Sequence, residues 1–167
     1  MIKLGFIVML AFVQCGEGNE QRTSAADEAK ATPVVSDSAG YGKQDLTKLK
    51  WIEGRWRGMY SNQPFYEIYR LLNDSTLEIT SYDWNGNDSI NTSRTYVRWS
   101  EGYYYLGNQK NWKVAGITDT AIVMKRNYKA SNDIVWRYNN ATSWDAYLES
   151  EKGTNHYHME AFDPFRK

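Results

Sequence analysis

Short apolar and aromatic runs follow one another from residue 51 to residue 162, separated by Asn, Asp, Gly and Ser. No window in this region keeps the 3.6-residue apolar period of an amphipathic helix. Runs of roughly four to eight such residues between turn-forming residues are typical of β-strands. The pattern predicts ten strands, over residues 55–60, 65–72, 76–84, 89–99, 103–106, 111–115, 121–126, 134–138, 143–149 and 155–162.

Ten strands at a spacing of roughly ten residues are typical of an all-β sandwich or an up-and-down barrel. We expect an antiparallel up-and-down β-barrel, because so many short strands in one meander would otherwise leave exposed sheet edges. A short helical piece over residues 45–52, with Asp45 as its N-cap, is expected to plug one end of the barrel.

Alternation along a strand separates its two faces. In the second strand both faces are aromatic, so the pattern leaves the interior face open: one carries Tyr66, Ile68, Arg70 and Leu72, the other Phe65, Glu67, Tyr69 and Leu71. The ninth strand divides more clearly, with Trp144, Ala146 and Leu148 predicted to face inward. In the tenth strand Tyr157, Met159 and Ala161 form a plausible inner face.

The first fifteen residues have the pattern of an export signal. A short positive start is followed by an apolar run, Leu4–Val13, which is too short to span a bilayer and ends just before Cys15. The stretch ending in Cys15 resembles the lipobox of bacterial lipoproteins, which implies lipidation of Cys15 and a membrane partner. An ordinary secretory signal with an incidental Cys15 is the alternative.

Residues 16–45 are rich in Gly, Ser, Ala, Glu and Asp, and they contain too few apolar residues to offset the entropy of ordering. We expect a flexible tether there, followed by the barrel domain over residues 46–167. Gly16 after the Cys resembles the sorting pattern for the outer membrane, so the expected location is the bacterial cell envelope, lipid-anchored to the outer membrane.

Composition narrows the class of partner. Twenty basic residues balance twenty acidic ones, so no overall field attracts nucleic acid. Aromatic residues make up 15% of the chain, with seven Trp and thirteen Tyr, as expected where large side chains fill a core or line a cavity.

Several motifs in order resemble a family of uncharacterised lipocalin-like (calycin-type) bacterial secreted proteins and lipoproteins. The opening motif is Gly54-x-Trp56, and the later pieces are Phe65-Tyr66-Glu67-Ile68-Tyr69, Asn73-Asp74-Ser75-Thr76-Leu77, Ser81-Tyr82 and Ile134-Val135-Trp136-Arg137-Tyr138. The resemblance covers residues 49–162 and implies a calycin-like barrel in which Arg166 lies over Trp56. The family often carries a His-Asp pair where this chain has residues 127–133 without His, so no catalytic residue is carried over.

A ligand site inside the barrel is expected to use aromatic side chains and one or two charged ones. Glu67 or Arg70 would orient the ligand, and the candidate ligand-binding residues are Trp56, Tyr66, Glu67, Tyr69, Arg70 and Trp136. The alternative for Glu67 is a rim or surface residue paired across strands with a cation such as Arg55 or Arg57.

His156, His158 and Glu160 share one face of the last strand, about 6.6 Å apart, and form the candidate metal triad. We favour an ordinary polar outer face, because the sequence has no other His to complete a site. No cofactor is therefore expected; zinc, or haem in a nitrobindin-like barrel, are the narrower alternatives.

The sequence thus predicts an envelope lipoprotein whose barrel binds a small apolar or aromatic ligand without catalysis. A cavity enzyme of the isomerase or hydrolase type, using Glu67 or the His156/His158 pair, is one alternative. A filled barrel that acts as an interaction module is the other, and an interior below about 300 Å³ would favour it.

Overall fold

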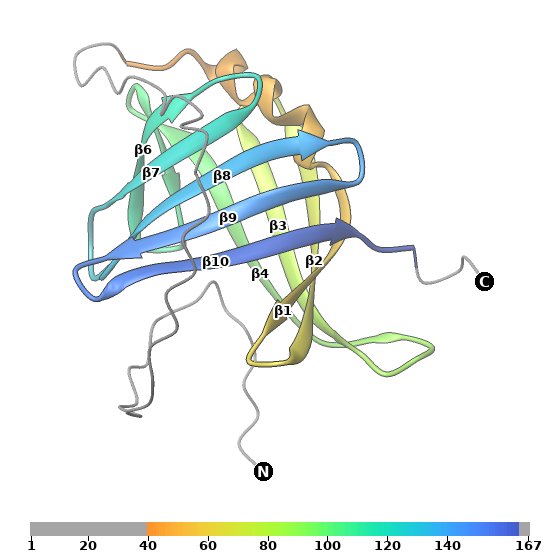
Figure 1. Ribbon diagram of the computed structural model, residues 1–167. Helices are drawn as coiled ribbons and strands as arrows, with labels where there is room; N and C mark the ends of the chain where they lie inside the picture. The colour runs from red at the N-terminus through yellow and green to blue at the C-terminus, as the bar shows by residue number, and fades with distance from the viewer. Residues whose placement is uncertain (1–39, 164–167) are drawn as a thin grey trace.

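The computed structural model describes residues 40–163, in which ten antiparallel strands close into one barrel (Figure 1). Each strand pairs with its neighbours in sequence, and β1 pairs with β10 to complete the ring. The strands are β1 (Gly54–Tyr60), β2 (Gln63–Asn73), β3 (Thr76–Trp84), β4 (Ser89–Ser100), β5 (Tyr103–Leu106), β6 (Trp112–Ile117), β7 (Ala121–Arg126), β8 (Asp133–Asn140), β9 (Ser143–Ser150) and β10 (Gly153–Ala161). The predicted all-β, up-and-down barrel of ten strands is confirmed.

One end of the barrel is covered by η1 (Lys43–Ile52), a 3₁₀-helix drawn in orange in Figure 1. Because neighbouring strands are antiparallel, successive turns alternate between the two ends. The turns β2–β3, β4–β5 and β8–β9 lie at the η1 end, which we call the plug end. The turns β1–β2 and β3–β4 lie at the opposite end, which we call the mouth.

The predicted helical plug is present, but its predicted N-cap is wrong. Gly42 occupies the N-cap position, and Asp45 lies three residues further on. The Asp45 carboxylate reaches back to accept a hydrogen bond from the Gly42 amide at 2.8 Å, and it pairs with Lys48 at 3.0 Å. A carboxylate in the first turn also interacts favourably with the positive end of the helix dipole. The helix therefore begins at Lys43, two residues before the predicted start at residue 45.

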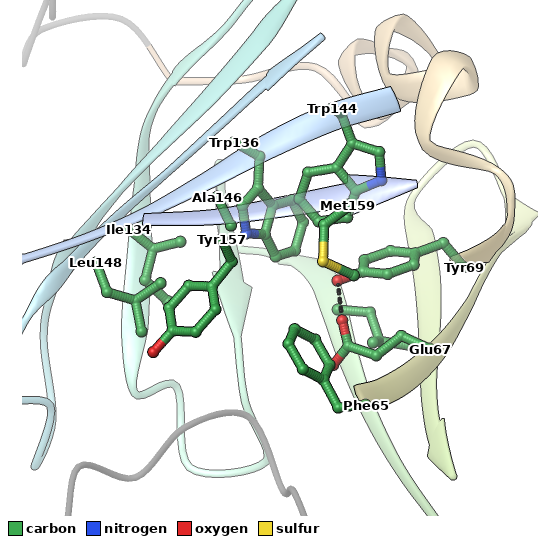
Figure 2. Close-up of a pocket in the computed structure, with 11 residues that line it drawn as sticks. Phe65, Glu67, Tyr69, Ile134, Trp136, Trp144, Ala146, Leu148, Tyr157 and Met159 are labelled. Carbon is green, nitrogen blue, oxygen red and sulfur yellow. Dashed lines mark hydrogen bonds between the residues drawn. The ribbon is translucent and has the colours of Figure 1, made fainter. Parts of the chain in front are cut away.

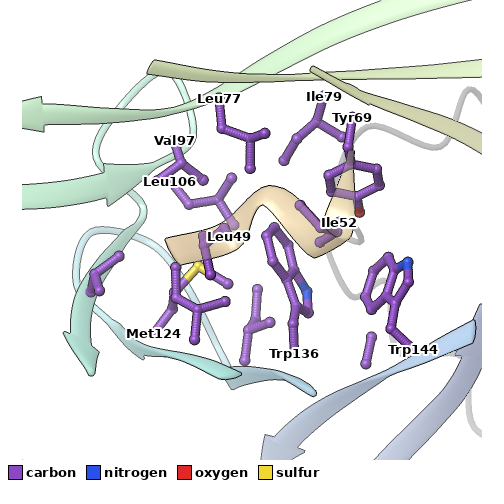
Figure 3. Packing of buried hydrophobic residues seen from close by; sticks show 14 of the residues in the cluster. Leu49, Ile52, Tyr69, Leu77, Ile79, Val97, Leu106, Met124, Trp136 and Trp144 are labelled. Carbon is purple, nitrogen blue, oxygen red and sulfur yellow. The ribbon is translucent and has the colours of Figure 1, made fainter. Parts of the chain in front are cut away.

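The apolar face of η1 fills the plug end of the barrel. Leu46, Leu49 and Ile52 have no exposed surface. Figure 3 shows Leu49 and Ile52 among inward side chains of the strands, which include Leu77, Ile79, Val97, Leu106 and Met124. The indole Nε1 of Trp56 donates a hydrogen bond to the Ile52 carbonyl at 2.7 Å, so the end of the plug is tied to the first strand.

A layer of aromatic rings lies below the plug, centred on Trp144. The Trp144 ring contacts those of Trp51, Trp56, Trp136 and Tyr69 at centroid distances of 6.2, 6.1, 5.7 and 5.4 Å. All four contacts are edge-to-face, a geometry that aromatic quadrupoles favour. Gly54 begins β1 at a φ of +142°, a conformation that favours glycine, and thereby brings Trp56 into this layer.

Several sequence predictions fall outside the described residues. They are the signal segment with Cys15, most of the tether, and the placement of Arg166 over Trp56. Within residues 40–163, no helix has the length and apolar character needed to cross a membrane.

The plug makes a testable contribution to stability. Leu49→Ala removes a fully buried side chain from the contact between η1 and the barrel. Substitutions of this kind cost about 2–5 kcal/mol, from lost burial and the cavity left behind. Chemical denaturation should show a loss in this range, whereas Lys50→Ala, at the next and exposed position, should change the free energy of unfolding by less than about 0.5 kcal/mol. Equal effects of the two variants would contradict a packed plug.

Candidate functional site

The interior face of β2 carries Glu67 into the middle of the barrel. Glu67 pairs in register with Trp56 of β1 and Ser81 of β3, and it is only 8% exposed. Tyr69 on the same face is 4% exposed. The face with Phe65, Glu67, Tyr69 and Leu71 therefore points inward, which settles the alternative that alternation along β2 left open.

Below the aromatic layer lies a cavity of about 60 Å³, which we call the inner cavity (Figure 2). Its lining is apolar and aromatic apart from one carboxyl group, and it consists of Phe65, Glu67, Tyr69, Ile79, Ile134, Trp136, Trp144, Ala146, Leu148, Tyr157 and Met159. In Figure 2, Glu67 and Phe65 lie on one side of this space, and Tyr157, Leu148 and Ile134 lie on the other.

Each oxygen of the Glu67 carboxyl accepts one hydrogen bond. The Tyr69 hydroxyl donates to Oε2 at 2.7 Å, and the Ser81 hydroxyl donates to Oε1 at 3.2 Å. Among residues 40–163, no Lys, Arg or His forms an ion pair with this carboxyl. Glu67 is thus a buried acid held by neutral donors only.

Burial dominates the protonation equilibrium of Glu67. Loss of water around the carboxyl raises its pKa above the usual 4.5, although the hydrogen bonds from Tyr69 and Ser81 act in the opposite direction. Burial and the neighbouring carboxylate also raise the pKa of the Tyr69 hydroxyl well above 10.0, which keeps it a hydrogen-bond donor. A cavity acid with a raised pKa is a candidate for a functional site.

A second and larger hollow opens at the mouth. This mouth pocket has a volume of about 350 Å³ and is lined by Tyr60, Ser61, Gln63, Pro64, Phe65, Tyr66, Ser81, Tyr82, Asp83, Asn91 and Ser93. Phe65 lines both the mouth pocket and the inner cavity. Ser81 lines the mouth pocket, and its hydroxyl donates a hydrogen bond to Glu67, which lines the inner cavity. The inner cavity therefore lies directly behind the mouth pocket.

Gly58 makes room for the Phe65 ring at this boundary. The two residues are register partners on β1 and β2. A Cβ atom at position 58 would lie 2.3 Å from Cζ of Phe65 and 2.7 Å from Sδ of Met159, which is far inside van der Waals contact. The glycine in the Gly54-x-Trp56-x-Gly58 pattern is therefore needed for the wall between the two hollows.

Three of the six predicted ligand-binding residues lie together in the inner cavity: Glu67, Tyr69 and Trp136. Trp56 is inside the barrel but packs between the plug and Trp144. Glu67 does not pair with Arg55 or Arg57, because it points inward while Arg57 pairs with Glu160 at 2.8 Å on the outside. The rim-carboxylate alternative for Glu67 is therefore wrong.

The structure places the other two predicted residues on the opposite face of β2. Tyr66 stacks on Tyr82 at 5.6 Å, contacts Phe162 at 4.8 Å and lines the mouth pocket rather than the inner cavity. The Arg70 guanidinium pairs with Glu78 at 2.9 Å on the outer surface. Arg70 is therefore not available to orient a ligand in the inner cavity.

Eight of the eleven residues that line the inner cavity were not among the predicted ligand-binding residues, and they include Phe65, Trp144, Tyr157 and Met159. Alternation did place Trp144, Tyr157 and Met159 on inner faces. The missing information was their height along the barrel, which the stagger of one strand on the next decides.

The candidate metal residues lie on the outer surface of β10 and have other partners. His158 Nδ1 and His156 Nε2 both face Oδ1 of Asp145, at 2.7 and 3.2 Å, while the Glu160 carboxylate pairs with Arg57 at 2.8 Å. Over the described part of the chain, no group of three or more His, Cys, Asp or Glu residues is placed to hold a metal ion.

No protein-family model matches this chain, and neither a curated protein nor a solved structure gives a match.

The raised pKa of Glu67 gives a pH dependence with a defined sign. The folded state holds the Glu67 proton more tightly than the unfolded state, so the contribution of this residue to stability is fully present below pH 4.5 and is lost as pH rises through the folded pKa. Glu67→Gln removes this loss. The variant should gain stability relative to wild type as pH rises, and each tenfold difference in proton affinity between the folded and unfolded states corresponds to about 1.4 kcal/mol.

Denaturation curves between pH 4 and pH 8 measure this difference. Glu101→Gln, at an exposed turn position, is the matched control and should run parallel to wild type. A Glu67→Gln curve that also runs parallel to wild type would contradict the raised pKa.

Proposed function

We propose that the barrel binds a small apolar or aromatic molecule, which enters at the mouth and extends into the inner cavity. One observation carries this proposal: the buried Glu67 carboxyl lies on the wall of an apolar, aromatic cavity without a cation to balance it. A buried carboxyl that lacks a charged partner costs stability, and a barrel that only needed filling would be more stable with an apolar residue there.

The volumes set the shape of the ligand. The inner cavity, at about 60 Å³, is too small for a whole ligand and taken alone favours a filled barrel. The mouth pocket, at about 350 Å³, falls within the range of small-molecule sites. The ligand therefore places its body in the mouth pocket and a small head group beside Glu67.

Anchoring to the cell envelope is the second part of the proposal. The apolar run Leu4–Val13 followed by Cys15, and the polar stretch after it, support a lipid anchor and a tether to the outer membrane. The resemblance to lipocalin-like secreted proteins and lipoproteins supports the same location. The barrel would then collect its ligand at the membrane surface.

A cavity enzyme is the second candidate function, favoured by the chemistry of the same residue. A carboxyl with a raised pKa beside the Tyr69 hydroxyl is suited to transfer a proton to or from a bound molecule. The His156/His158 pair takes no part in this candidate, because both imidazoles lie outside the barrel with Asp145.

Binding of N-phenyl-1-naphthylamine, a neutral dye that fluoresces in apolar surroundings, tests the proposal. We expect one dye molecule per chain. Ser93→Trp places a large ring in the mouth pocket and should weaken binding at least tenfold. Thr92→Trp puts the same ring on the neighbouring, exposed residue of β4 and should leave binding unchanged. No fluorescence gain, or equal binding by both variants, would favour the filled barrel instead.

A further inference from the structure

Five aromatic side chains surround the inner cavity, and they come from four different strands. They are Phe65 and Tyr69 of β2, Trp136 of β8, Trp144 of β9 and Tyr157 of β10. Tyr69, Trp136 and Trp144 contact one another at centroid distances of 5.4 to 5.7 Å, and Phe65 meets Tyr157 edge-on at 5.9 Å. The rings therefore form two fixed groups on the wall rather than isolated contacts (Figure 2).

The wall of the inner cavity carries groups that attract a cation. Aromatic ring faces carry the negative end of the ring quadrupole and attract cations. Among the residues that line the cavity, Glu67 is the one with an ionisable carboxyl group. The nearest charged residues on either side of it in the sequence are Arg57 and Arg70. They pair on the outer surface with Glu160 and Glu78, respectively. A cation in this cavity would meet aromatic rings and a carboxyl group, and no Lys, Arg or His among the described residues lines it.

We propose that the inner cavity binds the alkylammonium head group of a small organic cation, with Glu67 as its counter-ion and the surrounding rings as its cation–π partners. This inference rests on the proposed function and names the class of ligand. A cavity of about 60 Å³ holds roughly four water molecules. A trimethylammonium group has a similar number of heavy atoms, and the remainder of the molecule would extend past Phe65 into the mouth pocket.

Binding of a permanent cation is expected to release one proton from Glu67 to solvent. In the empty cavity burial favours the neutral carboxyl, and the arriving cation favours the carboxylate, so the Glu67 proton leaves to solvent as the ion pair forms. Tyr69 and Tyr157 are the other titratable groups on the wall. Burial raises the pKa of Tyr157 to about 12 and that of Tyr69 well above 10.0, so both stay neutral. The remaining polar group that contacts Glu67 is the Ser81 hydroxyl of β3. On the neighbouring strand β1, Trp56 lies opposite Glu67 and Gly58 lies opposite Phe65, and neither residue is charged.

Choline and 3,3-dimethylbutan-1-ol test the inference, because the two molecules have the same shape and only choline is charged. Calorimetry and tryptophan fluorescence on the full chain measure both affinities. We expect choline to bind at least tenfold more tightly than the neutral alcohol. Its affinity should rise with pH up to the Glu67 pKa, about tenfold per pH unit where the carboxyl is protonated, since choline itself does not titrate.

Glu67→Gln keeps the shape of the side chain and removes its charge. This variant should weaken choline at least tenfold and abolish the pH dependence, while the neutral alcohol changes less than twofold. Glu101→Gln, an exposed control, should leave both affinities unchanged.

Each other outcome contradicts the inference in a distinct way. Equal affinity for choline and the alcohol would overturn the ammonium assignment and leave the proposed apolar site standing. Binding of neither molecule would also overturn it, and the neutral-dye titration would then decide separately whether the barrel binds small molecules at all. Choline binding that Glu67→Gln leaves unchanged would place the cation elsewhere.

Discussion

The packing of η1 into one end of the barrel determines where the interior is solid and where it is hollow. A ring of ten strands is wider than its own inward side chains easily fill. Leu46, Leu49 and Ile52 supply the missing apolar volume at the plug end, and the Trp56 indole ties the last of them to β1. The aromatic layer centred on Trp144 rests against this plug. Below that layer the described side chains leave the inner cavity unfilled.

Glu67 gives that space its chemistry. Water is largely excluded from the carboxyl, and its two hydrogen-bond donors, Tyr69 and Ser81, are neutral. The residue therefore lowers the stability of the empty protein at neutral pH, and a cationic group at the same place would reverse that cost. Tyr69 connects the two parts of the interior, because its ring belongs to the aromatic layer and its hydroxyl holds Glu67. Tyr69 is thus part of both the packed aromatic layer and the candidate site.

The turns between strands made the fold predictable from sequence. Asn, Asp and Gly clusters mark the strand ends so clearly that β3, β5 and β7 begin and end at the predicted residues. Alternation was equally informative in β9 and β10, where polar residues mark one face. It failed for β2, because Tyr66 and Ile68 on the outer face are as apolar as Phe65 and Tyr69 on the inner one. Tyr66 is covered from outside by Tyr82 and Phe162, and that packing has no local signal in the sequence.

The candidate site was predictable only in part for the same reason. Glu67, Tyr69 and Trp136 stood out as a carboxyl and rings on short strands, and the structure brings these three together. Arg70 shares the strand but not the face, so a charge that seemed suited to a ligand pairs with Glu78 on the surface. Trp144, Tyr157 and Phe65 join the cavity through strand stagger, which sets the height of each residue and which the pattern of polar and apolar positions does not encode.

A crystal structure of the full chain grown with choline tests the central claim most directly, because it locates the cation. We predict that the trimethylammonium group lies in the inner cavity, within about 6 Å of the ring centroids of the surrounding aromatic residues, with the Glu67 carboxylate beside it. A choline bound on the outer surface, or an inner cavity in which apolar side chains close around Glu67 and leave no room for the cation, would contradict it.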